Sequence, residues 1–176
     1  TGNFYKIPEV VLRVNLLSVL NLLDWVVTNK IKSKLLFSSS SEAYAGTLEK
    51  SIPTPENISL CVDDVFNPRW SYGGSKIVGE LLFINYAKKH DLDMRIIRYH
   101  NIYGPRMGFE HVIPQFSRRA ANLENPFNMH AGSHTRAFCY IDDAVEATCL
   151  AMRSPESKGQ IVNVGTNEET TISDIA

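Results

Sequence analysis

The order in which helical and extended patterns alternate along the chain constrains its fold more than any other sequence feature. Apolar residues recur at helical spacing over residues 8–28, and residues 34–39 form a short apolar run that ends in serines. A second helical pattern covers residues 71–90, and residues 94–99 predict the next strand. Strands separated by a long helix pair in parallel, so we predict an α/β fold with a doubly wound parallel sheet covered on both faces.

The rest of the chain predicts shorter elements. Residues 46–70 carry three prolines and read as a surface excursion, which could be a substrate-facing loop or a plain one. We expect helices at 112–122 and 142–153, the second capped by Asp142, and strands at 127–130, 137–140 and 161–164. Thr171 and Asp174 have the spacing of a capping box. We expect the helix at 8–28 to be heavily buried.

The composition is that of an ordinary globular domain, with 44% hydrophobic and 21% charged residues. A net charge of −1 offers no basic field for nucleic acid. We see no apolar run near the roughly 20 residues that a membrane span needs. The three cysteines have neither disulfide-framework nor zinc-type spacing, and no metal site is evident. We therefore expect a soluble, cytoplasmic protein.

Tyr72 and Lys76 stand four residues apart in a helical pattern, about thirty residues after the serine cluster. One helical turn brings both side chains to the same face, so we expect the Lys76 charge to lower the Tyr72 pKa toward working pH. Tyr72 would then be a candidate acid/base, although the same pair also occurs on ordinary solvated helix faces. Ligands of open α/β sheets bind beyond the carboxyl ends of strands, which would place Ser40 and Glu42 in the cleft.

Four segments occur in an order that resembles the extended short-chain dehydrogenase/reductases acting on nucleotide sugars: FSSSSEAYAG, YGGSKIVGE, RIIRYHNIYGPR and GSHTRAFCYIDD. The resemblance implies a partial Rossmann-like, NAD-binding domain at 1–103 and part of a smaller α/β substrate-binding region at 104–176, interleaved with the core. The family's glycine-rich pyrophosphate turn has no counterpart in the sequence. We therefore expect an internal fragment of a longer enzyme, inactive alone and with little affinity for NAD.

The resemblance assigns chemistry to three residues. Tyr72 would be the general base that removes the sugar 4-hydroxyl proton as hydride leaves carbon 4 for NAD. Lys76 would shift the Tyr72 pKa and hold the nicotinamide ribose. Ser40 matches a serine or threonine that shares a hydrogen bond with the same hydroxyl, although a serine can also simply end a strand.

Other residues receive binding roles from the same resemblance. Those on the cofactor side, beside Tyr72 and Lys76, are Ser38, Ser39, Tyr99 and His100. Ser38 and Ser39 could instead be structural, and His100 could be a polar packing residue or a further acid/base. Those on the substrate side are Ser41, Asn101, Val112, Ile113 and Arg136. A planar guanidinium suits bidentate phosphate or carboxylate binding, so Arg136 could grip the diphosphate or lie near a sugar carboxylate.

Glu42 discriminates between activities within this family. In the family that this chain resembles, dehydratases and glucuronate decarboxylases have a glutamate at this position, whereas plain 4-epimerases commonly have a small or hydroxyl residue. Dehydratases generally precede the glutamate with an aspartate, and this chain has Ser41. The resemblance thus implies that Glu42 is a fourth catalytic residue, although it could also be an ordinary solvated loop carboxylate. We therefore expect UDP-glucuronate decarboxylation, with UDP-hexose 4-epimerisation, sugar-nucleotide dehydration or a non-catalytic dinucleotide-binding module as alternatives. The helices at 8–28 and 71–90 resemble those of the family's four-helix dimer contact, so a homodimer is expected.

Overall fold

The computed structural model describes residues 2–176 of the chain. In chain order the elements are α1 (Gly2–Lys6), α2 (Pro8–Thr28), β1 (Leu35–Ser40), η1 (Ser41–Ala43), η2 (Ala45–Lys50), α3 (Trp70–His90), β2 (Met94–Tyr99), β3 (Ile102–Tyr103), α4 (Val112–Ala121), β4 (Thr135–Arg136), β5 (Cys139–Tyr140), α5 (Ile141–Arg153), η3 (Pro155–Ser157), β6 (Ile161–Val164), β7 (Thr170–Thr171) and α6 (Ile172–Ile175).

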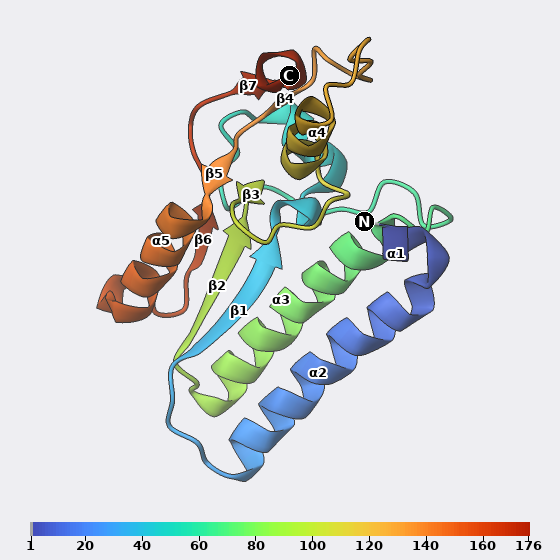
Figure 1. Ribbon diagram of the computed structural model, residues 1–176. Coiled ribbons are helices and arrows are strands. Elements are labelled where there is room, and N and C mark those ends of the chain that lie inside the picture. Colours follow the sequence, from blue (N-terminus) through green and yellow to red (C-terminus); the bar gives the residue numbers. More distant parts are fainter. Residues whose placement is uncertain (1) are drawn as a thin grey trace.

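Strands β1, β2 and β6 form a parallel sheet in the order β1-β2-β6. Helices α2 and α3 lie together on one face, and α5 covers the other (Figure 1). The expected α/β architecture with a parallel sheet is therefore confirmed. Both crossovers pass through long helices, as parallel pairing requires.

The main core lies between the sheet and the α2–α3 layer. Val19 and Leu23 of α2 meet Phe37 of β1, Phe83 of α3 and Ile96 of β2, and all five are buried. A second cluster, formed by Ile97, Cys139, Ala144 and Val164, fixes α5 to the opposite face.

Glycine lets α3 approach β1 closely. A Cβ atom on Gly79 would lie 2.3 Å from the Phe37 ring, so no larger residue fits there without displacing that ring. The element that carries Tyr72 and Lys76 is thereby held directly against the strand that ends in Ser40.

Helix α2 corrects two expectations. It is not heavily buried, because only one face contacts the core, while Val14 and Trp25 are 58% and 55% exposed. Its length of 21 residues and mean hydropathy of 1.7 are also sufficient, by length and composition alone, to cross a membrane, contrary to the sequence prediction. In the structure α2 lies along α3, to which it is joined by hydrogen bonds from Asn15 to Ser75 and from Tyr86 to Asp24.

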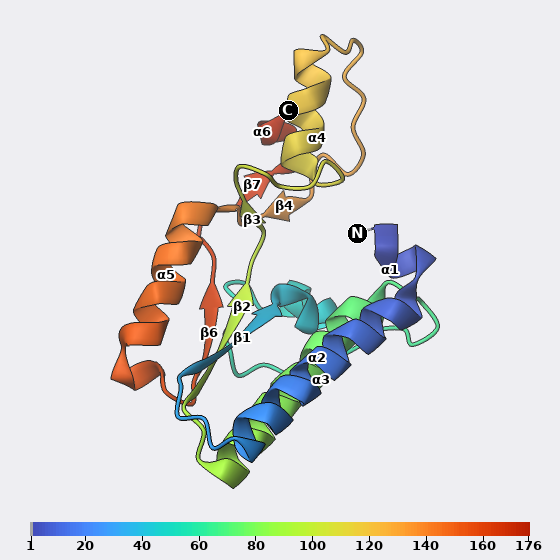
Figure 2. The same ribbon diagram turned by 60° about the horizontal axis from the view of Figure 1, so that its bottom comes forward.

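A region of short elements lies beyond the carboxyl ends of β1 and β2 (Figures 1 and 2). Here β4 pairs with β7 in antiparallel fashion, and β3 pairs with β5 in parallel. The strand predicted at 127–130 is wrong: this stretch is irregular, and its alternating Phe127 and Met129 face α4 and the cavity described below. The strand predicted at 137–140 is two two-residue strands, β4 and β5, on either side of Ala137 and Phe138.

Two predicted helix caps have different outcomes. The N-cap of α5 is Tyr140, without a side-chain cap, and Asp142 lies within the first turn, where it favours the positive end of the helix dipole. The predicted cap at Asp142 is therefore wrong. Thr171 and Asp174 do form a capping box at the start of α6.

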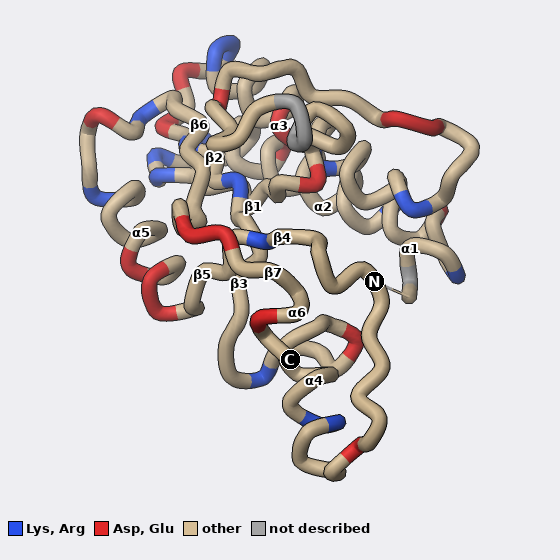
Figure 3. The backbone as a smooth tube through the Cα atoms, turned by 90° about the horizontal axis from the view of Figure 1, so that it is seen from above, with Lys and Arg blue, Asp and Glu red and all other residues tan. Residues whose placement is uncertain are grey.

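Lys and Arg are interspersed with Asp and Glu over the chain (Figure 3).

Candidate active site

The end of β1 and the start of α3 bring the four predicted catalytic residues together. Ser40 is the last residue of β1 and the N-cap of η1, where its hydroxyl accepts a hydrogen bond from the Glu42 amide at 3.2 Å. Helix α3 begins two residues before Tyr72 and packs on η1. A Cβ atom on Gly73 would lie 2.7 Å from the Glu42 carbonyl oxygen, so only glycine permits this contact.

Tyr72 is enclosed. Its ring stacks on Phe4 of α1, with centroids 5.0 Å apart and planes 11° from parallel. Burial raises the pKa of the phenol, a hydrogen bond with the Ser40 side chain acts in the opposite direction, and the Glu42 charge raises it further. The expected depression of the Tyr72 pKa by Lys76 is therefore wrong for this structure. Desolvation dominates, and Ser40 is the neighbour that favours the phenolate.

Lys76 lies near Tyr72, but its ammonium group is hydrogen-bonded to a backbone carbonyl of β1. Its ammonium donates a hydrogen bond of 2.7 Å to the Ser38 carbonyl and lies 5.3 Å from the centre of the Tyr72 ring. Burial lowers the pKa of Lys76. The strand end thus fixes Lys76 beside the phenol, with two of its three donors left for other groups.

Glu42 has a partner that sequence reasoning missed. The Arg69 guanidinium lies 3.3 Å from the Glu42 carboxylate, and both side chains are about two-fifths exposed. Arg69 precedes Tyr72 by three residues, so it stands just outside the first turn of α3. The position of Arg69, three residues before the candidate base, indicates in the sequence that a cation lies near the site. The spacing alone does not show which carboxylate it pairs with.

The four residues predicted on the cofactor side have different surroundings. Ser38 offers its carbonyl to Lys76. The Ser39 hydroxyl is turned into the core, where it donates to Glu80 at 2.5 Å, which favours the structural alternative for this side chain, and its predicted cofactor contact stays a prediction. The Tyr99 hydroxyl shares a 2.8 Å hydrogen bond with Thr148 of α5. His100 follows β2 directly, and its Nε2 atom is buried without a partner among the described residues.

These surroundings fit the nicotinamide end of a dinucleotide. Lys76 retains free ammonium donors, and the buried Nε2 of His100 awaits a hydrogen-bonding partner at the same carboxyl edge of the sheet. Burial lowers the pKa of His100, whereas a hydrogen bond with the Asn163 side chain acts in the opposite direction. The predicted contact of His100 with the nicotinamide stays a prediction.

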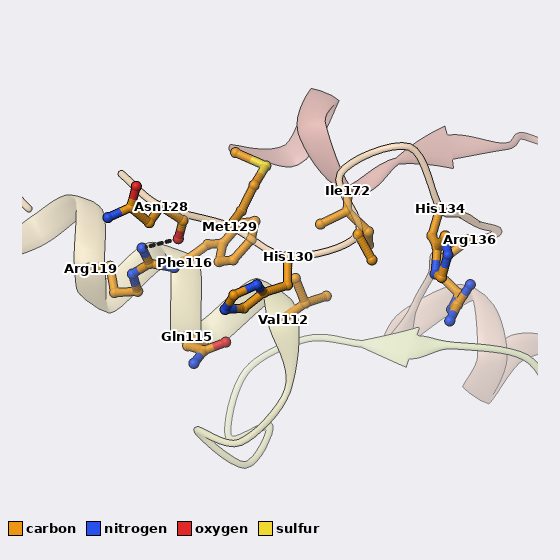
Figure 4. A pocket seen from close by; sticks show the side chains of 11 residues that line it. Val112, Gln115, Phe116, Arg119, Asn128, Met129, His130, His134, Arg136 and Ile172 are labelled. Carbon is orange, nitrogen blue, oxygen red and sulfur yellow. Dashed lines mark hydrogen bonds between the residues drawn. The ribbon is translucent and has the colours of Figure 1, made fainter. Parts of the chain in front are cut away.

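A cavity of about 280 Å³ lies among the short elements beyond the sheet (Figure 4). Two predicted substrate residues, Val112 of α4 and Arg136 of β4, line it together. Arg119 also lines the cavity, and its guanidinium lies 4.2 Å from the Phe127 ring centre and is paired with Glu124. The lining of the cavity thus combines apolar side chains with polar ones and two guanidinium groups.

The remaining substrate-side residues do not line this cavity. Ile113 stands beside Val112 in the first turn of α4. Asn101 has a left-handed backbone, with φ of 42°, and its carbonyl accepts a hydrogen bond from Cys139. Ser41 lies in η1 between Ser40 and Glu42. Their predicted contacts with a substrate stay predictions.

The family model described as "NAD dependent epimerase/dehydratase family" matches residues 2–165. The chain therefore belongs to this family. The extended short-chain dehydrogenase/reductase resemblance of the four motifs is confirmed, and the family is one of NAD-dependent enzymes.

Among curated proteins, the chain is similar to UDP-N-acetyl-alpha-D-glucosaminuronate decarboxylase of Bacillus cytotoxicus, with 37% identity over 150 residues, 84% of this chain and 45% of the relative. It is also similar to UDP-glucuronic acid decarboxylase 5 of Arabidopsis thaliana, with 30% identity over 98% of this chain and 50% of the relative. The chain thus spans about half the length of the curated relatives it matches.

Solved structures give the same fold. UDP-glucose 4-epimerase of Thermotoga maritima, solved with UDP-glucose, superposes with a TM-score of 0.83 and 28% identity, covering 97% of this chain and 53% of that one. UDP-glucuronic acid 4-epimerase of Bacillus cereus, in complex with UDP-glucuronic acid and NAD, superposes with a TM-score of 0.77 and 27% identity, covering 91% and 48%. The sheet and its helices are therefore those of Rossmann-fold epimerases.

Proposed function

We propose that the full-length protein decarboxylates a UDP-uronic acid, using NAD, through a 4-keto intermediate. The observation that carries the proposal is the placement of the Glu42 carboxylate in the same group as Ser40 and Tyr72, close enough for its charge to raise the Tyr72 pKa. Two of the relatives described above are decarboxylases of UDP-uronic acids, which supports the same choice.

The proposed chemistry assigns one step to each residue. Tyr72 removes the proton from the 4-hydroxyl while Ser40 holds the same oxygen, and bound NAD supplies a reversible acceptor for the hydride of carbon 4. The resulting ketone lies β to the carboxylate, so the bond between carbons 5 and 6 breaks, carbon dioxide leaves, and the electron pair moves to the carbonyl oxygen. Loss of carbon dioxide consumes one proton, and Glu42, after taking that proton from solvent, delivers it to carbon 5. Return of the hydride makes the turnover redox-neutral.

The cavity beyond the sheet serves the nucleotide in this proposal. Val112 and its apolar neighbours would contact the uracil, and Arg136 would bind the diphosphate or the sugar carboxylate. Residues 104–176 would therefore act as part of the substrate-binding region and residues 1–103 as the dinucleotide-binding part, although α5 and β6 return to the core sheet.

Incubation of the full-length protein with UDP-glucuronate tests the proposal directly. We expect carbon dioxide and a UDP-pentose, and we expect Glu42→Gln to suppress carbon dioxide release. No carbon dioxide from UDP-glucuronate, together with interconversion of UDP-hexoses, would favour the 4-epimerase alternative. Tight NAD binding without conversion of any UDP-sugar or dTDP-sugar would favour the non-catalytic module.

We also propose that the protein is a cytoplasmic homodimer that pairs α2 and α3 of each copy. The apolar residues exposed on these helices are Val10, Leu12, Val14, Leu17, Leu22, Trp25, Val78 and Leu81. A four-helix contact would remove this surface from water, and large exposed apolar patches commonly mark such protein–protein contacts. Light scattering should give twice the protomer mass, and Leu17→Glu should halve it; a monomeric wild type would contradict the homodimer.

A further inference from the structure

A row of polar residues crosses the sheet near the carboxyl ends of its strands, where apolar residues would be expected. Ser39, Arg98 and Asn163 are cross-strand neighbours on β1, β2 and β6. Strands of a parallel sheet covered on both faces are ordinarily near-continuous apolar runs. A buried row of this kind is costly unless every member is hydrogen-bonded, so its presence calls for an explanation.

The Arg98 guanidinium is the centre of this row. It binds Glu80 of α3 in bidentate fashion, with hydrogen bonds of 2.9 and 2.6 Å, and the two side chains are 3% and 2% exposed. It also donates to the Tyr44 hydroxyl at 2.7 Å and to the Glu56 carbonyl at 2.9 Å.

The partners of Arg98 extend the network to the neighbouring segments. Ser39 donates to the Glu80 carboxylate, and the Tyr44 hydroxyl donates to the Asn163 side chain at 2.9 Å. The Asn163 amide group in turn donates to the Thr54 carbonyl at 2.8 Å. The network therefore joins all three strands, α3, η1 and the loop before α3.

Three elements in the network, β1, α3 and η1, carry a candidate catalytic residue close to their contact. Ser39 precedes Ser40, Glu80 follows Lys76 by one helical turn, and the Tyr44 amide closes η1, which holds Glu42. A buried ion pair is weak evidence for stability, because an apolar replacement of similar volume is often neutral or stabilising. An apolar replacement would lack the directional hydrogen bonds that fix the elements relative to one another.

From this geometry we propose that Arg98, through Glu80 and Tyr44, is a positioning residue that sets the placement of Ser40 and Glu42 relative to Tyr72. The consequence for turnover rests on the proposed function, whereas the consequence for geometry does not. A misplacement of about 1 Å at a reacting group can cost about 10²-fold in rate, so loss of the network would lower kcat more than KM.

The test replaces the ion pair by apolar residues in the double variant Arg98→Met/Glu80→Leu of the full-length protein. The readout is the ¹⁹F resonance of Tyr72 in fluorotyrosine-labelled protein, assigned by its loss in Tyr72→Phe. Because Ser40 contacts the phenol, Ser40→Ala gives the position of this resonance when that contact is missing. We expect the double variant to move the resonance toward that position and to lower kcat at least about tenfold with little change in KM.

Arg95→Met is the matched control. Arg95 lies on the same strand and is equally buried, but it faces α5 and donates to Ser157 and the Ala151 carbonyl. The Arg95→Met variant should have a lower melting temperature than the wild type but an unchanged Tyr72 resonance. If the double variant does not fold, Tyr44→Phe and Ser39→Ala, which each remove one hydroxyl, should move the resonance in the same direction by less.

A folded double variant with the wild-type resonance would overturn the positioning role, as would wild-type resonances in both single-hydroxyl variants. Failure of the proposed function is seen separately, because it appears as absent conversion of nucleotide sugars by the wild type. The fluorine readout needs no substrate and decides the inference in either case.

Discussion

At the carboxyl edge of the sheet, the candidate catalytic residues stand on β1, on η1 directly after it and on the 21-residue helix α3. A hydrogen bond from Ser39 to Glu80 joins β1 to α3, and the buried ion pair of Glu80 with Arg98 joins α3 to β2. The cavity around Arg136, by contrast, is enclosed by α4, by irregular chain and by two-residue strands. In the first region, buried hydrogen bonds hold the elements that carry the candidate catalytic side chains in fixed relative positions. The second region offers a shaped surface with few buried cross-links, which suits recognition of a nucleotide more than bond breaking.

This comparison predicts that changes at the sheet edge act mainly on kcat and that changes at the cavity act mainly on KM. The largest effect is expected for Tyr72→Phe, which keeps the ring against Phe4 but removes the acid/base. We expect kcat to fall by about 10²–10⁴-fold with KM nearly unchanged. Steady-state kinetics measures both constants, with Tyr86→Phe on the same helix as the control. Unchanged turnover in Tyr72→Phe would remove the acid/base role.

At the cavity, Arg136→Lys keeps the charge but loses the planar fork of donors. We expect KM for the nucleotide sugar to rise by about tenfold or more while kcat changes little, because phosphate binding contributes equally to the ground and transition states. Arg153→Lys, at the exposed end of α5, is the control. A fall in kcat at constant KM would mean that Arg136 acts in the chemical step, which would contradict the division of roles between the two regions.

The pH dependence of kcat sharpens the account of the sheet edge. The phenolate is the active base, so kcat rises as pH passes the Tyr72 pKa. Ser40 lowers this pKa, so Ser40→Ala should move the acidic limb to higher pH. Glu42 raises it, so in Glu42→Gln the residual oxidation, followed as bound NADH, should move to lower pH. Shifts of the same sign in both variants would contradict the electrostatic assignment.

The smallest effect concerns stability beside the cavity. Thr171→Ala removes the side-chain oxygen that accepts the Asp174 amide at 3.0 Å in the capping box of α6. Loss of such a cap costs about 1 kcal/mol, so the free energy of unfolding should fall by about that amount in urea titrations. Serine at position 171 should restore it. A loss of several kcal/mol would mean that α6 is tied to the core more tightly than its contacts indicate.

The two regions also differ in what could be predicted from sequence. The long elements were found because apolar periodicity over twenty residues leaves little choice, and the strands at 94–99 and 161–164 have the predicted bounds. In the short region, Phe127 and Met129 alternate like strand residues but contact α4 and the cavity, because tertiary contacts override a pattern only four residues long.

At the site, sequence motifs identified the residues but not their electrostatics. Burial raises the Tyr72 pKa, contrary to the lowering expected from Lys76, and the ring that stacks on Tyr72, Phe4, is distant in sequence. The Arg98 network did leave a signal, since an arginine inside a strand expected to be covered on both faces needs a buried partner. Which partner it would find depended on the register of α3 against the sheet.

Transfer of the hydrogen on carbon 4 tests the central claim most directly. The full-length protein would be incubated with UDP-glucuronate carrying deuterium at carbon 4, and the product analysed by mass spectrometry and NMR. Oxidation and re-reduction at that carbon within one site predict a UDP-pentose that retains deuterium at carbon 4, formed with a primary isotope effect if hydride transfer limits the rate. A pentose product without deuterium at carbon 4 would contradict the account.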